Sequence, residues 1–122
     1  FVTPEKLRQG NELLLQTGAD SVLPVVKFGY PILRALQIEN NCLSMIWPEH
    51  MNTRSQDLKP AYHDAGQFYW GSRDAWLTNL RIHTNATGLV IPNWRVVDID
   101  TPEDWARAEI LYRAHYKQLT EI

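Results

Sequence analysis

The feature that most constrains the fold is a Thr-Pro-Glu helix start that occurs twice, once near each end of the chain. "TPEKLRQGNELLLQ" predicts a helix over residues 3–16, and "TPEDWARAE" opens a second helix predicted over residues 101–119. In both, the threonine is a good N-cap and the proline suits the first helical turn. Asp104 stands where a capping box places its acidic residue. Short runs rich in β-branched residues lie between the helices, and this alternation predicts an α/β layer fold.

The segments between the two helices predict the remaining elements. The expected elements are strands over 21–28, 66–71, 87–92 and 94–100, a hairpin of two strands over 32–38 and 42–47, and a short helix over 72–79. Pro24, inside the first strand, suggests an edge position or a bulge. The polar run "EHMNTRSQDLKP" follows no period, so we interpret it as an ordered loop.

The composition is that of an ordinary globular domain. The chain has 122 residues, of which 44% are hydrophobic and 21% charged, and this length supports one domain with one core. A net charge of -2 argues against a nucleic-acid partner held by bulk positive charge. The single cysteine, Cys42, favours a reducing compartment. Because no apolar run approaches the roughly 20 residues that span a bilayer, we expect no membrane segment and a cytoplasmic location.

Two aspartates, Asp98 and Asp100, stand one residue apart in "VVDIDTPEDW", at the end of an expected strand. Alternate residues of a strand point to the same side, so the two carboxylates would face together while Ile99 is buried on the other side. Like charges this close favour a shared cation, and Mg²⁺ commonly takes one or two carboxylates. Alternatively, Asp100 satisfies amide groups of the following helix and Asp98 is solvated. Spacing alone favours this second interpretation.

A second group of polar side chains lies in "NTRSQDLKPAYHDAGQFYW". An arginine with amide and phenol donors nearby suits a substrate carboxylate and several hydroxyls. The candidates are Arg54, Gln56, His63, Asp64, Gln67 and Tyr69. A solvated loop followed by an amphipathic strand is an equal alternative. Arg34, in an otherwise apolar expected strand, either reaches water or binds an anion.

These two segments, in this order, resemble the C-terminal half of the acylneuraminate cytidylyltransferase family, and specifically its pseudaminic acid cytidylyltransferase branch. The likeness runs from "FVTPEKLRQG" to "AEILYRA". It implies that residues 1–122 are the C-terminal portion of one cytidylyltransferase domain. The implied fold is the Rossmann-like nucleotide-diphospho-sugar transferase fold, with a mixed sheet flanked by helices. Residues 29–60 resemble an arm that crosses to a partner subunit, which implies a homodimer.

The activity that the resemblance implies is transfer of CMP from CTP to a nine-carbon sugar acid, with release of pyrophosphate and with Mg²⁺ as cofactor. The family's Asp-x-Asp motif matches Asp98 and Asp100, so the resemblance favours the metal site over the interpretation from spacing. The residues that it assigns to substrate binding are Arg34, Arg54, Gln56, His63, Asp64, Gln67 and Tyr69.

The chain departs from the wider family at two points. Where sialic acid synthetases typically show "RPNGA", this chain reads "YHDAGQFYW", which favours pseudaminic acid over sialic acid and leaves legionaminic acid open. The family's glycine- and basic-rich loop for CTP has no counterpart, and the chain begins at Phe1. We therefore expect part of a longer enzyme that is inactive alone. A non-catalytic sugar-binding or dimerisation module is the alternative function.

Overall fold

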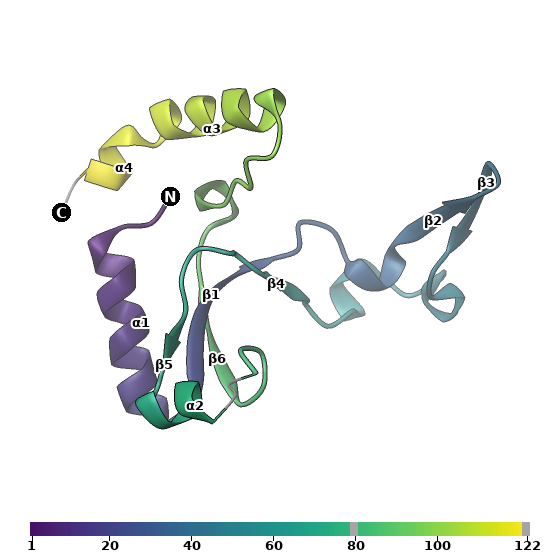
Figure 1. Cartoon of the computed structure of the whole chain (residues 1–122). Helices are drawn as coiled ribbons and strands as arrows, with labels where there is room; N and C mark the ends of the chain where they lie inside the picture. Colours follow the sequence, from purple (N-terminus) through teal and green to yellow (C-terminus); the bar gives the residue numbers. More distant parts are fainter. Residues whose placement is uncertain (79–80, 121–122) are drawn as a thin grey trace. The chain divides into compact units, whose positions relative to one another are not determined.

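A computed structural model describes residues 1–78 and 81–120 and divides the chain into two compact units. The larger unit comprises Phe1–Val26 and Asp64–Ile122, and the smaller comprises Lys27–His63. Both helices and strands are present, so the predicted α/β class is confirmed (Figure 1). No helix within the described ranges is long and apolar enough to cross a membrane.

The larger unit is organised around β1 (Ser21–Lys27), the longest strand of a mixed sheet. β1 pairs in parallel with β6 (Ala86–Val90) and antiparallel with β5 (Trp70–Gly71), and β4 (Tyr62–Asp64) completes the four strands. The strands predicted over 21–28 and 87–92 are therefore confirmed. The buried core that they form consists of Val22, Leu23, Val26, Ala65 and Ile91, with Leu89 and Val96 packed against it.

Pro24 does not mark an edge strand, because β1 has strand neighbours on both sides. The carbonyl oxygen of Pro24 accepts a hydrogen bond from the N–H of Ala65 at 3.0 Å, in the connection between β4 and β5. The N–H and the carbonyl of one strand residue point to the same neighbouring strand. In β1 the N–H that Pro24 lacks would therefore point at the connection between β4 and β5, where neither of these strands pairs with it. A buried central strand thus accommodates proline, and the predicted edge position is wrong.

The first helix, α1 (Pro4–Thr17), begins and ends at the predicted signals. The Thr3 hydroxyl accepts a hydrogen bond from the N–H of Lys6, and Gly18 ends the helix at φ 64°. An L-residue other than glycine adopts this left-handed conformation only at a cost, so Gly18 supplies the C-terminal stop.

Gly10 lets α1 approach the sheet closely. α1 packs against β5 and β6. A Cβ atom on Gly10 would lie 2.8 Å from Cδ1 of Trp70 and 3.0 Å from Cε2 of Phe68. The Trp70 indole N–H donates to the carbonyl oxygen of Leu7 at 2.9 Å, which fixes the ring against the helix backbone. A side chain at residue 10 would therefore separate α1 from β5.

The strand predicted over 66–71 is reduced to β5. A turn precedes it, in which the N–H of Gly66 donates to the Asp64 carboxylate at 2.7 Å and Gly66 adopts φ 64°. Because the Asp64 side chain closes this turn, the backbone here does not form strand hydrogen bonds, and strand pairing begins only at Trp70. The next predicted helix is confirmed as α2 (Arg73–Leu77), where the Ser72 hydroxyl accepts from Ala75. Residue 79 of that prediction lies outside the described residues.

The strand predicted over 94–100 is wrong. Asn93–Arg95 form a 3-10 turn, η4, and residues 96–100 pair with no described strand. The cause is that Pro92 starts a turn closed by Arg95 N–H to Pro92 O at 3.1 Å, while β1 already has neighbours on both sides. Ile99, predicted to be buried, is 47% exposed.

The C-terminal helix is divided in two. α3 (Pro102–Ala114) begins at the predicted capping box, with the Thr101 hydroxyl accepting from Asp104 N–H and the Asp104 carboxylate accepting from Thr101 N–H. His115 ends α3, and its ring stacks on Trp94 with centroids 3.9 Å apart. A separate helix, α4 (Tyr116–Thr120), follows in place of the predicted continuation.

The smaller unit carries the predicted hairpin. β2 (Leu36–Glu39) and β3 (Cys42–Met45) pair antiparallel, and Asn40 and Asn41 turn between them at φ 50° and 62°. This is the pair of left-handed residues that a tight hairpin turn requires. Residues 32–34 are a 3-10 turn, η1 (Ile32–Arg34), so the prediction that Arg34 lies in a strand is wrong. The predicted loop contains two further short turns, η2 (Pro48–His50) and η3 (Ser55–Asp57).

Candidate functional site

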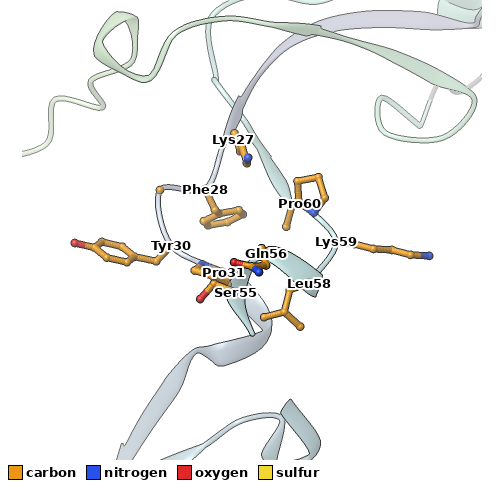
Figure 2. Close-up of a pocket in the computed structure, with 11 residues that line it drawn as sticks. Lys27, Phe28, Tyr30, Pro31, Ser55, Gln56, Leu58, Lys59 and Pro60 are labelled. Carbon is orange, nitrogen blue, oxygen red and sulfur yellow. The ribbon is translucent and has the colours of Figure 1, made fainter. Parts of the chain in front are cut away.

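A pocket of about 450 Å³ lies within the smaller unit (Figure 2). It forms where the chain leaves β1 and where it returns after η3, and the N–H of Phe28 donates to the carbonyl oxygen of Ala61 at 2.9 Å across this return. Phe28 lies near the centre of the view, and the Tyr30 and Lys59 side chains extend away from it. The lining residues are Lys27, Phe28, Gly29, Tyr30, Pro31, Ser55, Gln56, Leu58, Lys59, Pro60 and Ala61.

The chemistry of this pocket suits a polar anion with an apolar side. Lys27 and Lys59 carry ammonium groups, Ser55 and Gln56 offer hydrogen bonds, and Phe28 contributes a ring face. Polar groups around an apolar floor are typical of small-molecule sites. The structure places Gln56, one of the predicted substrate residues, in a pocket that two lysines border, of which Lys59 extends its side chain away.

The two predicted arginines of this unit lie beside the same segment. Arg34 lines an adjoining hollow of about 570 Å³ that shares Phe28, Tyr30 and Ser55 with the first pocket. Arg54 immediately precedes η3, and its Nε lies 2.9 Å from Oδ2 of Asp57. Its side chain is 73% exposed, so this ion pair is a surface contact that contributes about 0–1 kcal/mol. A ligand carboxylate can compete with so weak a pair.

His63 and Asp64 have different surroundings. The His63 ring meets Phe28 edge to face with centroids 5.0 Å apart. The Asp64 carboxylate accepts from the Tyr69 hydroxyl at 2.8 Å and lies 2.9 Å from Nε2 of His83. With the hydrogen bond from Gly66, these contacts make Asp64 the centre of a local hydrogen-bond network. The network joins two predicted residues, Asp64 and Tyr69, to His83, which was not predicted.

This network shifts the acidity of two groups. Partial burial acts to raise the pKa of Asp64, but hydrogen bonds from Gly66, His83 and Tyr69 outweigh it and hold that pKa below its ordinary value. The hydrogen bond to Asp64, with a smaller effect of burial, raises the pKa of Tyr69. Asp64 is therefore a carboxylate at neutral pH, and Tyr69 keeps its proton.

Gln67 is engaged within the larger unit. Its Nε2 donates to the carbonyl oxygen of Arg95 at 2.7 Å, which ties the connection before β5 to η4. In this arrangement the amide holds the backbone of Arg95 in place.

Asp98 and Asp100 are both exposed, on the segment between η4 and α3. The Asp104 carboxylate accepts from the N–H groups of Asp100 and Thr101, so Asp104 closes the start of α3 without the Asp100 carboxylate. No group of three or more His, Cys, Asp or Glu side chains able to hold a metal occurs in the described part of the chain. Two exposed carboxylates still fit Mg²⁺, which often completes its shell with water and substrate phosphates.

Among the residues of these sites that the sequence did not predict are three titratable ones, Lys27, Lys59 and His83. Lys27 ends a β-branched strand and Lys59 precedes a proline. Their place beside predicted elements was the only sequence feature that could have pointed to a role in a site. His83 approaches Asp64 across 19 positions of sequence, and its own surroundings in the chain carry no signal of that pairing.

Comparison with known proteins confirms the resemblance. The chain is 39% identical over 113 residues to a pseudaminic acid cytidylyltransferase of Campylobacter jejuni, covering 91% of this chain and 49% of that protein. The same enzyme of a second C. jejuni strain matches at the same identity and coverage. A Helicobacter pylori protein named pseudaminic acid cytidylyltransferase and UDP-2,4-diacetamido-2,4,6-trideoxy-β-L-altropyranose hydrolase is 42% identical over 57 residues, which are 47% of this chain and 11% of that protein.

The alignments cover a larger share of this chain than of its relatives. The chain spans about half the length of the C. jejuni relatives that it matches, while they account for nearly all of it. No family model matches the chain.

Proposed function

We propose that this chain, which is similar to the pseudaminic acid cytidylyltransferases over nearly its whole length, is the C-terminal part of such an enzyme. The reaction would join CMP from CTP to pseudaminic acid, a nine-carbon sugar acid, and release pyrophosphate. The observation that carries the proposal is 39% identity across 91% of the chain. Because the match covers about half of those relatives, CTP would be bound largely by residues outside this sequence, and the chain alone would be inactive.

The pocket of the smaller unit is our candidate for the sugar-acid site. Lys27 would attract the carboxylate of the substrate, and Gln56 would hydrogen-bond its hydroxyl or amide groups. Lys59, whose side chain extends away from the pocket, would add only longer-range attraction. Arg34, from the adjoining hollow, adds a third cation near the shared residues. Arg54 would exchange its surface partner Asp57 for the substrate carboxylate, at little cost because the existing pair is exposed.

The network around Asp64 would help to decide which sugar acid is accepted. Oδ2 of Asp64 contacts the Tyr69 hydroxyl and His83, and Oδ1 accepts from the N–H of Gly66, so the carboxylate and the exposed His83 ring have fixed directions. Fixed polar groups discriminate between hydroxyl and acylamino substituents more strongly than apolar walls do. His63, braced on Phe28, and Gln67, bound to the Arg95 carbonyl, would act by positioning the segments that carry them.

Asp98 and Asp100 are our candidates for the Mg²⁺ ligands. Their exposure leaves both carboxylates open to a cation and to the phosphates of a substrate. When bound, Mg²⁺ would supply charge neutralisation for a triphosphate. The role of this chain's own residues is to hold the two carboxylates at the start of α3, where the capping box fixes the backbone that carries them.

The hairpin of the smaller unit fits the proposed dimerisation arm, residues 29–60. Three of its apolar side chains face solvent, with 54% exposure at Leu36, 71% at Ile38 and 63% at Leu43. A two-stranded hairpin with such a surface is marginal in water unless something covers it. We therefore expect a homodimer in which this surface is buried, with the Rossmann-like fold completed by the rest of the enzyme.

The proposal is tested with the complete enzyme, CTP, Mg²⁺ and each of three sugar acids, measuring pyrophosphate. Pseudaminic acid should be the best substrate, ahead of legionaminic and N-acetylneuraminic acids. Lys27→Ala should raise the KM for the sugar acid about tenfold with little change in kcat, since a lost charge-assisted hydrogen bond is worth about 1.5–3 kcal/mol. Lys117→Ala, an exposed lysine of α4, is the matched control. Sugar-acid binding without any turnover would instead support the non-catalytic module.

A further inference from the structure

The adjoining hollow is continuous with the pocket of the smaller unit. It has a volume of about 570 Å³ and shares Phe28, Tyr30, Pro31 and Ser55 with the pocket. All the residues that line the two belong to the unit Lys27–His63. Each volume falls in the range of about 300–1,000 Å³ that is typical of ligand sites. Because the two share part of their lining, a ligand in the pocket can extend into the hollow without leaving this unit.

The walls of the adjoining hollow differ in chemistry from those of the pocket. Lys27 and Gln56 give the pocket a cation and an amide. The described residues that line the hollow and not the pocket are Ile32, Arg34 and Ala35. Two of these are aliphatic, and the third carries a guanidinium. The hollow therefore combines an apolar wall with one strong hydrogen-bond donor.

The backbone of η1 fixes the positions from which these three side chains start. The N–H of Arg34 donates to the carbonyl oxygen of Pro31 at 3.0 Å, and the N–H of Ala35 donates to that of Ile32 at 2.9 Å. The carbonyl oxygen of Ala35 accepts from the N–H of Ile46 at 3.1 Å, which ties the end of η1 to the residue after β3. A wall whose backbone is already ordered needs little further ordering when a ligand binds, and this lowers the cost of binding.

An acylamino group is the sugar substituent whose chemistry matches this combination. Its methyl group is apolar, which suits the side chains of Ile32 and Ala35. Its carbonyl oxygen accepts hydrogen bonds, which suits the Arg34 guanidinium, and its N–H can donate to the hydroxyl of Ser55, which lines both the hollow and the pocket. A hydroxyl substituent would leave the apolar wall unused, and a carboxylate would lose hydration against that wall.

We propose that the adjoining hollow receives one acylamino substituent of the sugar acid, while the pocket holds the carboxylate end of the same molecule. The acyl methyl group lies against Ile32 and Ala35, and the acyl oxygen lies beside the Arg34 guanidinium. This role of the hollow rests on the proposed function, since it places a further part of the same ligand. It adds Ile32 and Ala35 to the residues that decide which sugar acid is accepted.

The test uses the complete enzyme with CTP, Mg²⁺ and pseudaminic acid, which carries two acetamido groups, and with two analogues in which one or the other acetamido group is a formamido group. A formamido group keeps the amide and lacks only the methyl, so the ratio of kcat/KM for pseudaminic acid to that for an analogue reports the methyl contact. The unchanged enzyme should prefer pseudaminic acid to one analogue by about tenfold, as expected for one apolar carbon in a fitted pocket.

Two variants should change this ratio in different ways. Ile32→Ala removes the wall and should bring the ratio close to one, whereas Ala35→Leu fills the hollow and should make the formamido analogue the better substrate. Leu33→Ala is the matched control, because Leu33 belongs to the same turn but is not among the described residues that line the hollow or the pocket. It should leave the ratio unchanged.

A second measurement keeps the test decisive if neither variant folds. In the unchanged enzyme, NMR should show a nuclear Overhauser effect between one acetyl methyl group of bound pseudaminic acid and the δ1 methyl group of Ile32. Effects to other isoleucines alone would overturn the role of the hollow. So would a ratio that stays the same in both Ile32→Ala and Ala35→Leu, or a change confined to the KM for CTP, which would assign the hollow to the nucleotide. In those cases turnover of pseudaminic acid leaves the proposed function standing, whereas no pyrophosphate from any of the sugar acids would refute both.

Discussion

Replacing Gly10 by alanine should destabilise the protein, although alanine is the better helix former. In an open helix position the exchange would stabilise by about 1 kcal/mol. Here the new methyl would lie 2.8 Å from Trp70 and 3.0 Å from Phe68, inside normal contact distance. Overpacking of this kind costs about 1–3 kcal/mol, and displacing Trp70 also removes its 2.9 Å hydrogen bond to Leu7, worth about 1 kcal/mol. The net loss should be about 1–3 kcal/mol.

The assay is equilibrium urea unfolding followed by tryptophan fluorescence. Gly29→Ala is the matched control, because a Cβ at Gly29 meets no atom within 4 Å and its backbone is not left-handed. This control should leave the free energy of unfolding unchanged or raise it by about 0.4–1 kcal/mol through the unfolded state. If Gly10→Ala raised stability by the full helix-propensity gain, the close contact between α1 and Trp70 would be refuted.

Three further outcomes follow from the structure. The pKa of Asp64 is lower in the folded protein than in the unfolded chain. Its contribution to the free energy of unfolding is therefore fully present above the unfolded-state pKa of about 4, and is lost as the pH falls through the folded-state pKa. Asp64→Asn should therefore flatten the acid limb of a plot of Tm against pH, and an unchanged limb would contradict the network. Thr101→Ala should cost about 1 kcal/mol in urea unfolding by removing the N-cap of α3. Ile38→Asp or Leu43→Asp should convert a dimer of the complete enzyme to monomer in analytical ultracentrifugation, whereas a dimer that persists in both would exclude the hairpin as the interface.

Elements set by local signals could be predicted from the sequence. Thr3 and Thr101 as N-caps and Gly18 as a C-terminal stop depend only on neighbouring residues, and each was predicted correctly. The β1 strand was equally clear from its β-branched run. Such features need no knowledge of distant segments, because their hydrogen bonds close within a few residues.

The errors arose where a distant neighbour decides the outcome. "VVDID" alternates like a strand, yet β1 already has partners on both sides, so residues 96–100 remain unpaired. Pro24 looks like an edge residue until the gap between β4 and β5 is known. The link between Asp64 and His83, and the position of both Lys27 and Lys59 on one pocket, likewise depend on chain segments that the sequence does not show to be adjacent.

The roles proposed for the candidate residues rest on similarity and on chemistry together. Strand geometry does not bring the carboxylates of Asp98 and Asp100 together, because no strand is present there. The assignment of Asp98 and Asp100 to Mg²⁺ now depends on their exposure and on the resemblance. Gln56 and Arg34 line two adjoining hollows that share Phe28 and Ser55, and their role in substrate binding stays a prediction.

The most direct measurement is pyrophosphate release by the complete enzyme from CTP and pseudaminic acid, as a function of Mg²⁺ concentration, with and without the double change Asp98→Asn and Asp100→Asn. The account predicts Mg²⁺-dependent release that the double variant loses by at least a hundredfold, while its thermal stability stays near that of the unchanged enzyme. Equal Mg²⁺-dependent rates in the two proteins would contradict it.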